Sequence, residues 1–97
     1  MDKLKKFDLM AKIARELEDL KNSQQAVLEK IGKIEVDNIE LGNSTLEKEL
    51  PEIYQRTADN ADAIRDILDT FQQTTDDYAA KNNIDRLREQ QTINSIK

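Results

Sequence analysis

The chain has 97 residues, of which 37% are hydrophobic, 36% charged and 4% aromatic, and its net charge at pH 7 is −5. This composition leaves one domain at most and too little apolar mass for a thick core, and the acidic balance argues against a nucleic-acid partner. Because His and Cys are absent, the usual catalytic and zinc-binding side chains are missing, so we expect neither an enzyme nor a cofactor.

The chain contains no apolar stretch long enough to cross a bilayer. The first residues, Met1 to Asp8, include three lysines but are not followed by the apolar stretch of a secretory signal peptide. We therefore expect no transmembrane segment, and either a cytoplasmic location or export without a conventional signal peptide.

A long first helix is predicted over about residues 2–41. Its apolar residues alternate in steps of three and four, which is typical of a helix that packs along another helix. The predicted interaction seam contains Met10, Ile13, Leu17, Leu20, Gln24, Val27, Ile31 and Ile34. Gln24 is the polar member of this row, and it either sets the register of the contact or lies at a solvated edge.

A turn is predicted at residues 42–44, because Gly42 suits the left-handed position that ends a helix. Ser44 and Glu47 have the spacing of a capping box that would start a second helix over about 45–81. Pro51 leaves two interpretations open. Residues 45–50 form a separate turn, or the helix is continuous and kinked at the proline.

The second helix carries a matching row with the same alternation. Its predicted seam contains Tyr54, Thr57, Ala61, Ile64, Leu68, Phe71, Thr75 and Tyr78. Two amphipathic helices joined by a short turn predict an all-α fold, with a long, antiparallel, coiled-coil-like hairpin over residues 1–81. The seam pattern fails after Tyr78, so residues 82–97 are predicted as a C-terminal tail, either a third short helix or a frayed extension.

Apolar residues beyond this seam predict a further contact surface. It contains Phe7, Leu9, Leu28, Ile53, Ile67, Ile84 and Leu87. A second hairpin would bury these side chains, which favours a four-helix bundle formed by a dimer. Gly32, Val36 and Ile39, together with Leu28, form a weaker strip that indicates either a local bend or a second packing surface.

An acidic row lies on the outer side of the predicted second helix. It contains Asp59, Asp62, Asp66 and Asp69. The row is either a solvated helix face or a docking stripe for a basic partner. No loop that would wrap a cation is present, so we expect no metal site.

The segment from Ile64 to Ala80, in which Phe71 is followed by Asp76, Asp77 and Tyr78, resembles the last helix of a known family. The family comprises the small helical-hairpin proteins of Gram-positive type VII secretion loci, including the Trp-x-Gly class and the α-helical partners of toxin effectors. The length of about a hundred residues, the two long helices and the acidic balance agree with this resemblance.

The chain departs from the family's pattern at two places. Its turn contains Leu41, Gly42 and Asn43 in place of a Trp. The export motif needs an acid four residues after an aromatic, where Phe71 is followed by Thr75 and Tyr78 by Asn82. No site residue is transferred from the family.

These observations predict a non-enzymatic module that binds another helical protein or a second copy of itself. The resemblance implies a chaperone or targeting partner for a secreted effector. Two alternatives remain open: a self-associating structural coiled coil, such as a phage or envelope scaffold, and a small acidic regulator that sequesters a binding partner.

Overall fold

The computed structural model describes residues 1–96 and contains three helices: α1 (Lys3–Leu41), α2 (Ser44–Lys81) and α3 (Ile84–Ile96). No strand occurs in this described part of the chain. The predicted all-α hairpin with a short C-terminal helix is therefore confirmed. The predicted tail forms α3, and its last residue, Lys97, lies outside the described residues.

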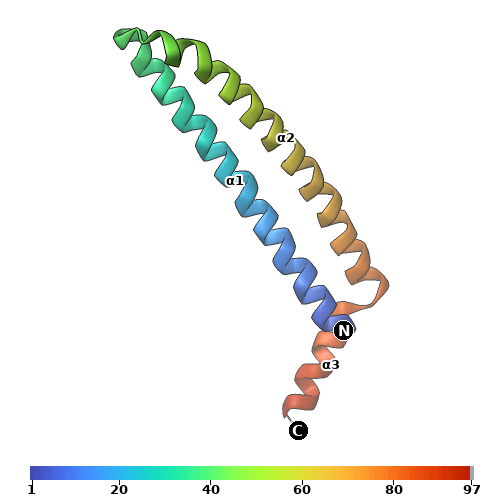
Figure 1. Ribbon diagram of the computed structural model, residues 1–97. Coiled ribbons are helices and arrows are strands. Elements are labelled where there is room, and N and C mark those ends of the chain that lie inside the picture. The colour runs from blue at the N-terminus through green and yellow to red at the C-terminus, as the bar shows by residue number, and fades with distance from the viewer. Residues whose placement is uncertain (97) are drawn as a thin grey trace.

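Helices α1 and α2 lie side by side and antiparallel, and α3 continues beyond the end where α1 begins (Figure 1). The molecule measures 70 × 24 × 17 Å, so it is a rod only two helices wide. Such a rod has one narrow line of contact and two broad open sides. Its core is correspondingly thin, and the buried apolar side chains are Ala14, Leu28, Ile31, Leu50, Leu68 and Ile84.

The turn between α1 and α2 is held by Asn38, which sequence analysis missed. The side chain of Asn38 is buried, and its Nδ2 donates to the carbonyl of Asn43 at 3.0 Å while its Oδ1 accepts from the Asn43 backbone N–H at 2.9 Å. Gly42 ends α1 with φ 72°, and its N–H donates to the carbonyl of Asn38 at 2.7 Å. The turn is therefore fixed by one buried amide as well as by the glycine.

The start of α2 differs from the predicted capping box. Asn43 is the N-cap, because its Oδ1 accepts from the backbone N–H of Leu46 at 3.0 Å, and Ser44 is already helical. An asparagine side chain satisfies an exposed N–H at this position as well as a serine does. At the other end of the rod, Asp2 caps α1 in the same way by accepting from the backbone N–H of Lys5 at 2.8 Å.

Helix α2 runs without interruption through Pro51, so the continuous interpretation of this segment applies. Figure 1 shows that the first turns of α2 lie at an angle to the rest of the helix. A proline inside a helix lacks an N–H and crowds the carbonyl four residues earlier, here that of Glu47, which bends the helix at this point. A hollow lined by residues of both α1 and α2 lies beside this bend.

The seam on α2 follows the predicted row. Leu68 and Thr75 are buried, and Thr57, Ala61, Ile64, Phe71 and Tyr78 are half-buried. Tyr54, the first member of the row, is exposed, contrary to the prediction. The buried hydroxyl of Thr75 has a hydrogen-bond partner within α2, because its Oγ1 donates to the carbonyl of Phe71 at 2.9 Å.

The seam on α1 differs from the prediction at every second position. Met10, Leu17 and Ile31 are buried or half-buried as predicted, and Gln24, for which the sequence left two positions open, is half-buried. Contrary to the prediction, Ile13, Leu20, Val27 and Ile34 are exposed. The residues that follow these four take their places in the contact: Ala14, Lys21, Leu28 and Glu35. The row Met10, Leu17, Gln24, Ile31 continues at a seven-residue spacing to Asn38, so the buried amide at the turn belongs to the same line of contact.

Helix α3 is attached to the hairpin through its first turns. Asn83, with φ 49°, turns the chain, and Ile84 is the most buried apolar side chain, with 3% of its surface exposed. Arg88 forms an ion pair with Asp8 of α1. This ion pair lowers the pKa of the Asp8 carboxyl, chiefly through the hydrogen bond from Arg88, and raises that of Arg88.

Candidate docking surfaces

One extended apolar feature of the surface is a row along α1, formed by Ile13, Leu20, Val27 and Ile34. Each of these side chains keeps between 39% and 44% of its surface exposed. They are spaced by seven residues, so they form a straight line along the helix beside the seam. Exposed apolar residues scattered singly are normal in soluble proteins, but a line of four is the arrangement by which one helix packs along another. Leu41, which is 74% exposed, extends the line by one more seven-residue step at the turn end of α1.

Helix α2 adds Ile53 and Ile67, which are 37% and 53% exposed. Gln25 of α1 and Arg65 of α2 line one hollow, so they mark one side of the hairpin. At 100° per residue, Leu20 lies roughly 140° around α1 from Gln25, and Ile67 lies roughly 160° around α2 from Arg65. Both are therefore on the opposite side. We call this side the apolar face, and it contains Ile13, Leu20, Val27, Ile34, Ile53 and Ile67.

The structure divides the predicted partner surface into exposed and buried residues. Leu9, Ile53, Ile67 and Leu87 are exposed, whereas Phe7 is half-buried and Leu28 and Ile84 are buried. Leu28 is unavailable because α1 turns it toward α2. Ile84 is unavailable because it anchors α3. Leu28 and Ile84 therefore contribute to packing within one chain and not to a partner surface.

A second apolar surface lies at the turn end of the rod, beside the bend at Pro51. This tip groove has a volume of about 750 Å³, and its apolar lining comes from Val36, Ile39, Leu46, Leu50, Pro51 and Tyr54. Gly32 contributes to the wall, and a Cβ added there would meet no atom within 4 Å. Of the weak strip predicted from the sequence, Gly32, Val36 and Ile39 therefore form one side of this groove, whereas Leu28 is buried in the seam and does not line it.

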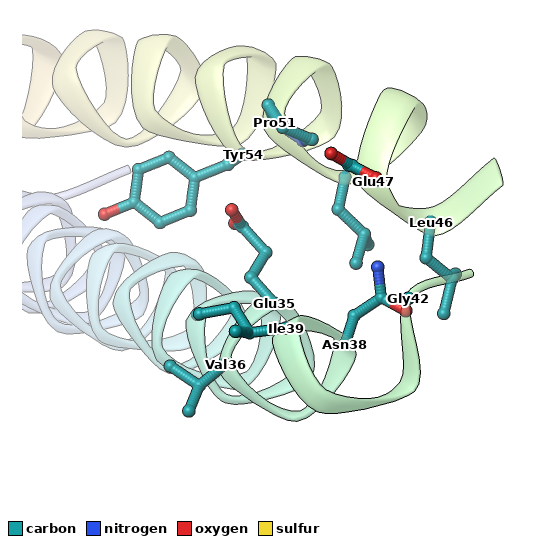
Figure 2. A pocket seen from close by; sticks show the side chains of 11 residues that line it. Glu35, Val36, Asn38, Ile39, Gly42, Leu46, Glu47, Pro51 and Tyr54 are labelled. Atoms are coloured by element: carbon teal, nitrogen blue, oxygen red, sulfur yellow. The ribbon is translucent and has the colours of Figure 1, made fainter. Parts of the chain in front are cut away.

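The charged side chains that line the tip groove are both acidic. Glu35 lies on α1 and Glu47 on α2, and Figure 2 shows Glu35 and Tyr54 extending from facing helices into the same space. The carbonyl of Glu47 also receives no helical hydrogen bond from Pro51, because proline has no N–H. The groove thus combines apolar walls with hydrogen-bond acceptors.

The acidic row on the outer side of α2 is partly paired. Arg65 contacts Asp62 and Asp66, each at 3.4 Å, and Gln55 donates to Asp59 at 2.9 Å. Within residues 1–96, no three acidic side chains gather closely enough to hold a metal ion. The row has the character of a solvated helix face with local ion pairs and hydrogen bonds.

Comparison of the chain with protein-family models, with curated proteins and with solved structures finds no match. Among the described helices, none has the length and apolar character needed to cross a membrane.

Proposed function

We propose that the protein is a non-enzymatic interaction module that binds other α-helices through the apolar face. One observation carries this proposal: Ile13, Leu20, Val27 and Ile34 form a seven-residue repeat that α2 leaves uncovered. A seven-residue apolar repeat on a rigid helix is a docking line for another helix, because each side chain can enter the gap between side chains of the partner.

The resemblance to type VII hairpin proteins supports a more specific form of this proposal. Under it, the bound helix belongs to a secreted effector, and the hairpin acts as its chaperone or targeting subunit. Helices of 39 and 38 residues provide a rod along which a long effector helix would pack. The tip groove then offers a second contact at the end of the same rod.

The proposal is tested by replacing Leu20 with a photo-activated cross-linking amino acid and irradiating cells of the organism that naturally makes the protein. The matched control carries it at Asn22, which is exposed on α1 away from the apolar face. Cross-linked products are expected for the Leu20 variant and not for the Asn22 variant, and peptide mapping should place the attachment site in a helical segment of the captured chain. Equal capture at both positions, or none at Leu20, would contradict the proposal.

A further inference from the structure

We propose that the occupant of the apolar face is a second copy of this chain, with α1 packed antiparallel on α1 of the second copy. This inference rests on the proposed function, namely that the apolar face binds a helix. It assigns that helix to α1 of a second copy in place of an effector helix, and it adds the register. It follows from two sets of pairs along α1 that share a centre at Ser23 and Gln24: Ile13 with Ile34 and Leu20 with Val27 in the apolar row, and Glu16 with Lys30 on its flank.

The first pattern is the apolar row itself. When two α1 helices run antiparallel with their centres together, Ile13 faces Ile34 of the second copy, and Leu20 faces Val27. A two-fold axis repeats each contact, as is usual in homodimers. These four side chains are exposed to a similar extent, so the paired stretch is open along its length. Leu41, the next residue of the row, would lie opposite Lys6 of the second copy, at the edge of this stretch.

The second pattern is the charge beside the row. Three residues after Ile13, Leu20, Val27 and Ile34 come, respectively, Glu16, Ser23, Lys30 and Asp37. Because these occupy one position of the repeat, they form a single flank of the apolar face. Antiparallel pairing puts Glu16 opposite Lys30 of the second copy, twice, and puts Ser23 opposite itself. Within residues 1–96, neither Glu16 nor Lys30 has an ion-pair partner, so both remain available.

Other orientations bring like charges together. A parallel pair of α1 helices would place Glu16 beside Glu16 and Lys30 beside Lys30. Stacking α1 on α2 of the second copy would bring Arg56 to the level of Lys30 and Lys33. Flanking charges select orientation in helix pairs mainly by such repulsion.

Helix α2 follows the same register. With α1 on α1, α2 lies antiparallel on α2 of the second copy, where Ile53 faces Thr74 and Ile67 faces Asn60. The assembly is a four-helix bundle in which each apolar side chain of the face is covered.

The experiment uses the purified full chain, which has no cysteine of its own. Light scattering across a dilution series should give twice the mass of the monomer. A short bismaleimide should then link Ser23→Cys to itself. It should link Glu16→Cys only when that variant is mixed with Lys30→Cys. Asn22→Cys, which points away from the face, serves as the control and should stay unlinked.

Charge exchange provides the second readout. Glu16→Lys should raise the dimer dissociation constant about tenfold, since two attractive pairs become repulsive. Lys30→Glu should do the same, and the double variant should restore the original value. Helicity of the three variants, measured at one concentration, controls for folding.

The outcomes test the antiparallel pairing separately from the proposed function. A mass of one chain at all concentrations, self-linking of Glu16→Cys, or no recovery in the double variant would overturn the antiparallel pairing. If the chain is monomeric alone but is captured at Leu20 in cells, the proposed function stands and this inference fails. If the chain is monomeric and nothing is captured at Leu20 in cells, both the proposed function and this inference fail.

Discussion

Val27 and Leu28 are adjacent in α1 but lie in opposite environments. Leu28 is 8% exposed and packs in the seam, whereas Val27 is 44% exposed on the apolar face. A rotation of α1 by one residue, about 100°, would exchange them. This orientation determines which apolar row holds the monomer together and which row remains for a partner.

Alanine at these two positions should therefore have unequal effects. Leu28→Ala should lower the free energy of unfolding by roughly 2–3 kcal/mol, because it opens a gap in the seam. Val27→Ala should change it by less than about 0.5 kcal/mol, as for most surface substitutions. The measurement is urea unfolding followed by circular dichroism in dilute solution, where association does not contribute. Equal losses would show that both side chains are packed in the monomer.

Asn38→Ala should destabilise the hairpin by about 1–2 kcal/mol, because the backbone N–H and carbonyl of Asn43 lose their partners. Thermal unfolding of this variant can be compared with that of Asn22→Ala, an exposed asparagine of the same helix. We expect the control to unfold at or above the temperature of the original chain. A loss of similar size in both variants would mean that the turn does not depend on Asn38.

The two glycines should respond to alanine with opposite signs. Gly32 is helical and a Cβ there meets nothing within 4 Å, so Gly32→Ala should raise stability by about 1 kcal/mol. Gly42 has φ 72°, so Gly42→Ala should lower stability by about 1–2 kcal/mol. Calorimetric melting of the pair checks both signs at once. Stabilisation by Gly42→Ala would be incompatible with the left-handed turn.

The attachment of α3 should depend on pH through Asp8. Because Arg88 lowers the pKa of Asp8 in the folded chain, the ion pair stabilises the attachment above the ordinary aspartate value of roughly 4. That stabilisation should be lost as the pH falls through the lowered value. Asp8→Asn should remove it at neutral pH, with faster hydrogen exchange in the first turns of α3 and little change in α2. Glu89→Gln, on the exposed side of α3, is the matched control and should leave exchange unchanged.

The sequence predicted the hairpin but not the rotation of its first helix. The turn around Gly42 and the heptad row on α2 are strong local signals, and both lie where they were expected. On α1, two neighbouring rows repeat every seven residues, so their period cannot distinguish them. The row with Ile13, Leu20, Val27 and Ile34 is apolar throughout, so it completes the alternation of steps of three and four, whereas the neighbouring row includes Lys21 and Glu35.

The structure buries the other row, although it includes Lys21 and Glu35. Long charged side chains can lay their apolar stems along a contact and keep their charges in water, which composition alone does not indicate. Asn38 is in phase with this buried orientation and is fixed by hydrogen bonds to the backbone of Asn43. The sequence signal for it was only an asparagine four residues before Gly42. The sequence indicated one wall of the tip groove through Gly32, Val36 and Ile39, but the other wall is formed by the start of α2, where Pro51 left two interpretations open.

The most direct test of the orientation of α1 is the rate at which a thiol reagent labels Val27→Cys and Leu28→Cys in dilute, folded protein. The chain has no other cysteine, so each rate reports one position. The apolar face described above requires Val27→Cys to react several times faster than Leu28→Cys, with equal rates in denaturant. Faster labelling of Leu28→Cys in the folded protein would contradict it and return Ile13, Leu20, Val27 and Ile34 to the seam.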